Sequence, residues 1–383
     1  MHRIGSHTTS QERVARALRE QLANGVWTCG ERIPTEMTLS EALGVSRPTL
    51  RAALARLEDE GLLENRGRRG RVVARSAQRA DNGVMSGTVV VATHRSLDAK
   101  PGDHGGTIDA IESGMLDEAS ARGLSILRLH RDRLTPETCT WLRENRPAGL
   151  VLTAQVAYLP VIAGLASTLL AAGIPVVSNE AAPGLDACDQ VLFDHAGGAA
   201  ALVRWFVAQG CRRILPFWST TERGVAWLED RERGCRNAVL EAGLAPLEPI
   251  RCDLPARGAE GDGSAHWHRT RHVLGYLYEE LARPDGADAV MLLEDGSVYP
   301  FLGACRIAGW RVGPGGIRVS GFDDFWAECW ERSIEPLDNL ATVDKQNHLA
   351  GREIVRLLAD RNGLLPPGSD PIHRIIPSLP SLP

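Results

Sequence analysis

Residues 34–73 read PTEMTLSEALGVSRPTLRAALARLEDEGLLENRGRRGRVV, and this stretch decides the fold of the N-terminal part of the chain. Thr35 can cap a short helix that Gly44 ends in a left-handed conformation. After a tight turn, Ser46 can cap the next helix. An amphipathic pattern over residues 11–22 predicts one more helix in front of this pair. The stretch therefore predicts a helix-turn-helix unit.

The second helix of the pair has one apolar face and one face of small and basic side chains. Small side chains let a helix approach the floor of the DNA major groove. Arg47 and Arg51 can bond phosphates or the edge of guanine. The apolar residues that share the opposite, core-facing side are Leu50, Ala53, Leu54 and Leu57.

A basic hairpin follows, with expected strands at 62–63 and 72–73. Residues 65–79 hold six arginines and no acidic residue. A basic loop with glycines can reach a narrow minor groove or straddle phosphates. Arg68 and Arg69 are its candidate phosphate contacts.

This ordered set of parts resembles the winged helix-turn-helix of the GntR family, through VSRPTLR at 45–51, LEDEGLL at 57–63 and the glycine-rich wing. The resemblance implies an α+β DNA-binding domain over residues 8–75. It also implies DNA contacts from Arg47, Thr49, Arg51 and the wing-tip Gly70. Many members have arginine where this chain has Met37, which cannot bind phosphate or guanine. The open alternative is a solvated or protein-docking helical face, and the length of the match favours DNA.

Composition sets the limits on the rest of the chain. Its 383 residues suit two or three domains, and 43% hydrophobic with 24% charged residues is typical of globular proteins. No apolar run approaches the ~20 residues of a membrane span, and the N-terminus lacks the apolar region of a signal peptide, so we expect a cytoplasmic protein. Lys and Arg outnumber Asp and Glu by 14 to 9 in residues 1–80, but are outnumbered by 39 to 29 afterwards. We therefore expect the basic residues 1–80 and the acidic remainder of the chain to bind different partners.

Residues 76–87 are polar and without periodicity, so we expect a linker there. From residue 88 onward, short apolar strands alternate with helices, which predicts parallel sheets covered on both faces. The expected strands lie within 88–94, 124–130, 148–154, 174–180, 212–218, 249–252, 289–295 and 317–324. The expected helices span 107–122, 136–145, 160–172, 195–209, 229–242, 268–282 and 297–308.

Five strings in this part resemble the LacI/GalR-type effector domain, itself similar to periplasmic sugar-binding proteins: AAGIPVVSNE, GCRRILPFW, DRERGCRNAVLEAGL, ADAVMLLEDG and IRVSGFDDF. The resemblance implies a two-lobed α/β periplasmic-binding-protein-like domain over 88–377. The first lobe is expected at 88–193 and 344–371, the second at 196–340 and 372–377. A GntR head on such a body resembles the arabinose-repressor subgroup. The expected fold is multidomain.

Ligands of open parallel sheets bind beyond the carboxyl ends of strands, and polar side chains stand at those places. The candidate effector-binding residues are Glu180, Arg231, Glu294, Asp323 and Lys345, with Trp218 and Trp267 as platforms for a sugar ring. Carboxylates and arginine can bind vicinal hydroxyls, while an aromatic face covers the ring. The resemblance implies that Arg231 and Asp323 match the ligand residues of the family's ERxxG and GFDD motifs. Each candidate can also be a helix cap or a surface ion pair.

Two glutamates depart from the family pattern. Glu180 stands where aspartate is frequent, and Glu294 where asparagine is frequent. An ionised carboxylate accepts hydrogen bonds but donates none. Because Glu294 replaces a neutral asparagine, the pocket is more acidic than a neutral-sugar site, which favours an additional hydroxyl or an amine on the ligand.

The sequence gives little support for a metal site, for paired cysteines or for a catalytic lysine. His268 and His272 have the i, i+4 spacing of a zinc pair beside His266, but arginines lie between them, so we expect no metal site. The eight cysteines form no CxxC pair, and we expect buried thiols. Neither lysine, Lys100 or Lys345, has the setting of a Schiff-base lysine. We therefore expect no cofactor and no enzyme.

We predict a DNA-binding transcriptional regulator, specifically a repressor. It would bind double-stranded operator DNA as a homodimer, under the control of a small-molecule effector, a sugar or a sugar derivative. The alternative is a DNA-binding protein whose C-terminal domain only dimerises or binds a non-sugar ligand.

Overall fold

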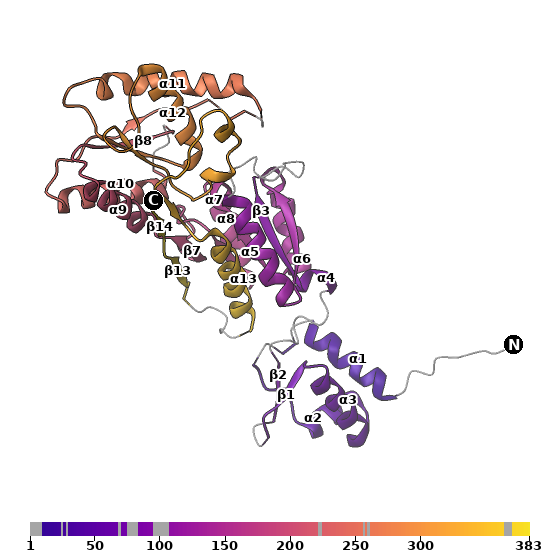
Figure 1. Ribbon diagram of the computed structural model, residues 1–383. Coiled ribbons are helices and arrows are strands. Elements are labelled where there is room, and N and C mark those ends of the chain that lie inside the picture. The colour runs from indigo at the N-terminus through magenta and orange to yellow at the C-terminus, as the bar shows by residue number, and fades with distance from the viewer. Residues whose placement is uncertain are drawn as a thin grey trace.

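The computed structural model describes residues 10–23, 26–27, 30–67, 70–74, 83–94, 107–220, 224–255, 257–258, 261–363 and 370–383. Figure 1 shows an N-terminal head and a two-lobed body. The head contains α1 (Ser10–Ala23), α2 (Glu36–Leu43) and α3 (Arg47–Asp59), and its hairpin pairs β1 (Leu63–Asn65) antiparallel with β2 (Arg71–Val73).

The predicted caps define the helix-turn-helix. The side chain of Thr35 accepts the N–H of Thr38 at 3.3 Å, and Ser46 accepts that of Thr49 at 3.3 Å. Gly44 ends α2 with a φ of 61°. The apolar faces of the helices meet in a core with the hairpin, which contains Leu18, Leu22, Leu39, Leu50, Leu54, Leu57, Leu63 and Val73.

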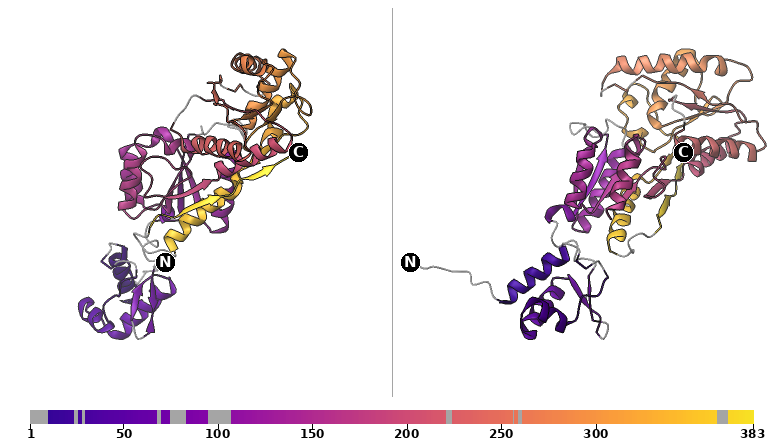
Figure 2. Two further views of the ribbon diagram at one scale, coloured as in Figure 1. Left: turned by 90° about the vertical axis from the view of Figure 1, so that its left-hand side faces the viewer. Right: turned by 180° about the vertical axis from the view of Figure 1, so that it is seen from behind.

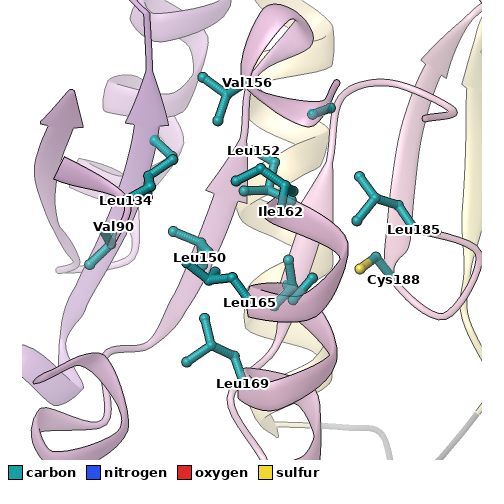
Figure 3. Close-up of a cluster of buried hydrophobic side chains, with 14 of the residues drawn as sticks. Val90, Leu134, Leu150, Leu152, Val156, Ile162, Leu165, Leu169, Leu185 and Cys188 are labelled. Carbon is teal, nitrogen blue, oxygen red and sulfur yellow. The ribbon is translucent and has the colours of Figure 1, made fainter. Parts of the chain in front are cut away.

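The first lobe is a parallel sheet with helices on both faces. Its strand order is β13-β7-β6-β5-β3-β4, from β3 (Thr88–Thr93), β4 (Ser125–His130), β5 (Gly149–Leu152), β6 (Val176–Ser178), β7 (Asp189–Phe193) and β13 (His373–Ile376). Val90 points to the face under α6 (Pro136–Asn145) and α8 (Ile162–Ala171). Figure 3 shows Val90 in one cluster with Ile162, Leu165 and Leu169 of α8. Val89 and Val91 point to the other face, under α5 (Thr107–Ala121) and α13 (Asn347–Gly363). The alternation follows from the two-residue period of a strand.

The second lobe repeats this plan with the strand order β11-β10-β8-β9. Its strands are β8 (Ile214–Trp218), β9 (Ile250–Arg251), β10 (Ala289–Leu292) and β11 (Arg318–Ser320). One face packs against α9 (His195–Ala208) and α10 (Ala226–Glu241), the other against α11 (Gly263–Leu281) and α12 (Val298–Ala308). A short antiparallel pair, β12 (Thr342–Asp344) with β14 (Leu379–Ser381), completes the body. Figure 2 shows the same division into head and lobes from two further sides.

One lobe boundary differs from the prediction. We expected residues 372–377 in the second lobe, but His373–Ile376 pair in parallel with Gln190–Phe193 at the edge of the first sheet. The pairing buries Ile376 against the first-lobe core and gives the N–H of Ile372 an acceptor in Asp189, at 2.8 Å.

The expected linker contains regular structure where it is described. Gly83–Ser86 form the single turn α4, directly before β3, and residues 76–82 lie outside the described residues. A second short helix, α7 (Ala154–Ala157), follows β5.

The described cysteines are free thiols, all of them buried, as their spacing predicted. Among the helices that the structure describes, none combines the length and the apolar character that a bilayer crossing requires.

Candidate DNA-binding face and ligand pocket

The start of α3 carries the side chains predicted to contact DNA. Arg47 and Arg51 are exposed, and the hydroxyl of Thr49 bonds that of Ser46 at 2.7 Å. Gly70 ends the hairpin loop with a φ of 80°, where a Cβ atom would lie 2.8 Å from Nε of Arg32. Because residues other than glycine rarely adopt this φ, glycine is favoured at the wing tip. The two other predicted contacts, Arg68 and Arg69, lie outside the described residues.

Glu36 connects α3, the helix predicted to enter the DNA groove, to the β1–β2 hairpin, which is the wing. The sequence analysis missed this role. Its carboxylate accepts from Nη2 of Arg51 at 2.9 Å and from Nη1 of Arg71 on β2 at 2.8 Å. Arg71 also donates to Glu58 of α3. Hydrogen bonds from Arg51 and Arg71 lower the pKa of Glu36 to about 2. This network fixes the position of Arg51 relative to the hairpin.

Arg231 is the centre of the predicted ligand residues and is only 3% exposed. Its Nη2 lies 3.3 Å from Oδ1 of Asp323, and its Nη1 donates to the carbonyl of Leu293. Its Nε donates to Nδ1 of His195 at 3.2 Å, so this nitrogen is the acceptor of a neutral ring. Burial and the nearby Arg231 lower the pKa of His195 well below its ordinary value.

A glycine brings Arg231 to this position. A Cβ atom at Gly234 would lie 2.2 Å from the carbonyl oxygen of Ala196. The backbones of α10 and α9 are therefore in close contact one turn after Arg231 and one residue after His195. The close approach of the two helices brings the side chain of Arg231 within hydrogen-bond distance of His195.

Lys345 and Glu180 extend the group across the lobes. Nζ of Lys345, after β12, lies 2.9 Å from Oδ1 of Asp323. Burial alone would raise the pKa of Asp323, but Lys345 and Arg231 lower it below its ordinary value. Glu180, after β6, is 3.4 Å from the hydroxyl of Tyr158. Burial raises the pKa of Glu180 to about 7, against the effect of Lys345. We call Glu180, Arg231, Asp323 and Lys345 the interlobe cluster.

The backbone at Asp323 is strained. Its φ is 100°, which a side chain other than glycine rarely adopts. Asp295 holds the following loop in place: it accepts the N–H of Phe325 at 2.7 Å, the N–H of Trp326 at 3.0 Å and the hydroxyl of Thr342 at 2.7 Å. Strain of this kind persists where the surroundings over-determine it, commonly at functional sites.

A pocket, which we call the interlobe pocket, opens beside the interlobe cluster and is lined by both lobes. Of the interlobe cluster, Glu180 is part of its lining, and Arg231, Asp323 and Lys345 are not. The side chains around it include Asn179, Glu180, Phe193, His195, Trp227, Asp230, Arg233 and Ile375. The pocket is therefore lined by carboxylates, an amide, an imidazole and aromatic rings. Such a set can bind hydroxyl groups and cover an apolar ring face.

The two predicted platform residues lie elsewhere. Trp218 is fully buried in the core beneath α9 and α10, because this last residue of β8 points to the inner face of its sheet. Trp267 lies on the side of α11 that meets α12, where the guanidinium of Arg306 is 5.0 Å from its ring centre. Trp218 therefore cannot cover a ligand in this structure, whereas the role of Trp267 stays a prediction.

Other aromatic rings surround the interlobe cluster. Phe322 lies 3.7 Å and Trp227 4.9 Å from the guanidinium carbon of Arg231, and Phe193 lies 5.1 Å from Nζ of Lys345. Trp227 was missed because α10 begins at Ala226, earlier than the expected residue 229. Phe322 directly precedes Asp323 in the sequence. Its place beside a predicted ligand residue could have indicated that its ring lies near the site.

Glu294, at the end of β10, lies near Asp323 and Arg231 but also near a second pair of arginines. Burial raises its pKa above the ordinary value, while Arg269, Arg257 and Arg231 act in the opposite direction. It therefore extends the interlobe cluster along the edge of the second-lobe sheet.

The three histidines of α11 do not converge. His268 and His272 are exposed and stacked, with their Nε2 atoms 3.0 Å apart. His266 is buried, with Nε2 3.8 Å from Glu335. Of the two lysines, Lys345 pairs with Asp323, and Lys100 lies outside the described residues.

Known families match both parts of the chain. The family described as bacterial regulatory proteins, gntR family, matches residues 10–73, and the periplasmic binding protein-like domain matches residues 203–379. An uncharacterized HTH-type transcriptional regulator, Rv0494 of Mycobacterium tuberculosis, is 36% identical over 126 residues, which are 33% of this chain and 46% of that relative. The chain spans less than half the length of the curated relatives that it matches.

Solved structures extend the likeness to the whole body. The transcriptional regulator CelR in complex with cellobiose has a TM-score of 0.59 at 21% identity, over 91% of this chain and 99% of that chain. A regulatory protein of the LacI family from Chloroflexus aggregans has a TM-score of 0.58 at 23% identity, over 78% of this chain and 96% of that chain. These identities show the fold alone. The chain therefore joins a GntR-family helix-turn-helix domain to a periplasmic-binding-protein-like domain with the fold of LacI-family regulators.

Proposed function

We propose that the chain is a transcriptional regulator whose operator binding is controlled by a small molecule in the interlobe pocket. The observation that carries this proposal is the interlobe cluster, buried between two lobes that are joined to a GntR-type head. Buried charges are costly to keep, and they gather at sites of function. A ligand that contacts both lobes favours one arrangement of the lobes over another, and so alters the DNA-binding equilibrium.

We assign the effector to the sugars and sugar derivatives. Asp323, Glu180 and Arg231 supply acceptors and donors for hydroxyl groups, and the rings of Trp227 and Phe322 lie beside them. The solved neighbour that holds cellobiose supports this class. The resemblance to the arabinose-repressor subgroup supports the role of a repressor.

The head accounts for the DNA partner. One chain offers one recognition helix, and specific sites usually combine two half-sites. We therefore propose a homodimer on a pseudo-palindromic operator, with Arg47, Thr49 and Arg51 at the bases and the wing on the backbone.

A thermal-shift screen of sugars, followed by operator binding, tests the proposal. A ligand at ~100 times its Kd stabilises the fold by ~2.7 kcal/mol. We expect one sugar class to raise the melting temperature and the same compound to change operator affinity. Stabilisation without an effect on DNA would contradict the regulatory role.

A second candidate is a body that only dimerises, and one observation favours it. Asp323, Arg231 and Lys345 satisfy one another without a ligand, as structural ion pairs do. In that case no small molecule stabilises the protein, and operator affinity follows protein concentration alone.

A further inference from the structure

A second charged group is buried in the second lobe, next to the interlobe cluster. Arg269, in the second turn of α11, is 5% exposed. Its Nε and Nη1 atoms are buried without a hydrogen-bond partner in the described chain. An ionised group without acceptors is costly to bury, and native proteins rarely leave one in that state. The missing acceptor calls for an explanation.

The neighbouring carboxylates do not supply that acceptor. Both oxygens of Glu331 bond Arg257: Nε reaches Oε1 at 2.7 Å, and Nη2 donates to Oε2. Glu294 is the opposite charge that acts most strongly on Arg269, yet no hydrogen bond joins them. Arg257 is therefore neutralised by its own partner, and Arg269 is not.

Arg269 lies among groups at one edge of the second-lobe sheet, since Glu294 and Arg257 are the charged residues that act on it most strongly. Arg257, Glu294 and Asp323 come after β9, β10 and β11, at the carboxyl edge of one parallel sheet. Gly296 lies between two of them: a Cβ atom there would be 3.4 Å from Oε1 of Glu294 and 3.6 Å from Nη1 of Arg257. The arginine pair is therefore continuous with the interlobe cluster through Glu294.

We propose that Arg269, with Arg257 beside it, forms a subsite for an anionic group of the effector, a carboxylate or a phosphate. The inference rests on the proposed function and narrows the effector to a sugar acid or a sugar phosphate. It replaces the amine preference expected from the sequence, because the unpartnered Arg269 adds a cation that the sequence analysis did not include. The anion supplies the acceptors that Arg269 lacks, in a charge-assisted hydrogen bond. The hydroxyl-bearing part of the same molecule then lies along Glu294 towards Arg231 and Asp323.

The charge balance of the unliganded protein agrees with an anion. Arg231, Lys345 and Arg269 remain after Arg257 is paired with Glu331. Opposite them stand Asp323, Glu294 and Glu180, and burial raises the pKa of both glutamates, that of Glu180 to about 7. Because Glu180 is only partly ionised near neutral pH, these carboxylates do not fully balance the three cations.

Matched ligands test the inference on the full-length protein. The panel holds glucose, galactose and mannose, each with its uronic acid, its 6-phosphate and its 2-amino derivative, measured by thermal shift and then by calorimetry. We expect a charged member to bind at least tenfold more tightly than its neutral parent. The uronic acids and the phosphates distinguish a carboxylate from a phosphate.

Arg269→Met ties the preference to this residue. Methionine keeps the length of the side chain and removes the charge, and Arg269 makes no hydrogen bond that the variant loses. We expect this variant to melt no lower than wild type, to bind the acid at least tenfold more weakly and to bind the neutral parent within threefold. Arg269→Lys keeps the charge and should retain part of the preference. Arg283→Met, a surface control just beyond α11, should change neither affinity.

Three results would overturn the inference. Tightest binding of a neutral or amino sugar removes the anionic subsite and leaves the sugar sensor standing. An undiminished acid preference in Arg269→Met places the anion elsewhere. If no member of the panel binds, the inference fails together with the sugar assignment itself.

Discussion

Asp323 holds two cations in one buried group. Asparagine has the same shape and tolerates a positive φ, but it lacks the charge that compensates Arg231 and Lys345. Breaking a buried ion pair from one side costs about 3 kcal/mol or more. We expect Asp323→Asn to lower the free energy of unfolding of the body by about that amount in urea. The exposed neighbour Asp324, at a φ of 58°, is the control, and Asp324→Asn should stay within about 0.5 kcal/mol of wild type. Equal effects of the two variants would contradict this role of Asp323.

Glu36 makes the head sensitive to acid. Arg51 and Arg71 lower its folded pKa to about 2, whereas the pKa of an unfolded glutamate is about 4.3. Because the folded pKa is the lower one, the stabilisation is complete above about pH 5 and is lost as the pH falls through 4 towards 2. We expect hydrogen exchange of α3 to be faster in Glu36→Gln than in wild type at pH 6, and the difference to vanish near pH 2. A difference that is independent of pH would rule out the ion pairs as its cause.

Arg51 is the residue on which base specificity depends most directly. If it makes a bidentate contact with guanine, Arg51→Ala should reduce the discrimination between operator and mutated operator by about tenfold or more. Arg56→Ala is the matched control on the same helix, since Arg56 bonds Glu60 and Glu12. Competition binding with mutated operators measures both. Unchanged discrimination in Arg51→Ala would exclude the contact.

The sequence predicted the positions of some site residues and not those of others. Arg231 and Asp323 were predictable from strand ends and motifs, and the structure brings them to 3.3 Å. Trp218 was misjudged because the face to which a strand-end side chain points depends on the whole sheet. The unpartnered guanidinium of Arg269 gives no sequence signal, since only packing shows which hydrogen bonds are absent.

At the scale of elements, local patterns predicted some segments well and others not at all. The helix expected over 136–145 is α6 with the same bounds, because Thr135 caps it and Pro136 fits its first turn. Strand β7 was missed because it begins with the polar Asp189 and Gln190. Asp189 is buried because Arg361, 172 residues later, pairs with it and the N–H of Ile372 donates to it. Pairings across such distances decide strands that local hydrophobicity does not.

The contact between α9 and α10 makes a further element-scale prediction. Gly234→Ala places a methyl group against the carbonyl oxygen of Ala196, at 2.2 Å without rearrangement. We expect the variant to lose about 1 to 3 kcal/mol of stability and to move Arg231 away from His195. Gly164→Ala on α8 is the control: nothing lies within 4 Å of its new Cβ atom, so it should stabilise by about 0.5 to 1 kcal/mol. Denaturant unfolding measures the stability of both variants. If Gly234→Ala has the same free energy of unfolding as wild type, the close contact is contradicted.

At the scale of the whole molecule, the head and the pocket are separate in sequence and joined through the first lobe. An effector shifts operator binding only by its different affinity for the two arrangements of the lobes. The interlobe cluster joins side chains from both lobes, so its geometry changes when the lobes move. The general plan of head and two lobes was predictable from the sequence, whereas the return of β13 to the first sheet was not.

The most direct test of this account is the operator affinity of wild type and Asp323→Asn, each with and without the sugar that gives the largest thermal shift. We predict that the sugar changes wild-type affinity at least tenfold. Asp323→Asn, measured at a temperature at which its melting curve shows the body folded, should bind operator within threefold of wild type and show no response at the same sugar concentration. If Asp323→Asn responds as wild type does, the interlobe cluster is structural and the effector site lies elsewhere.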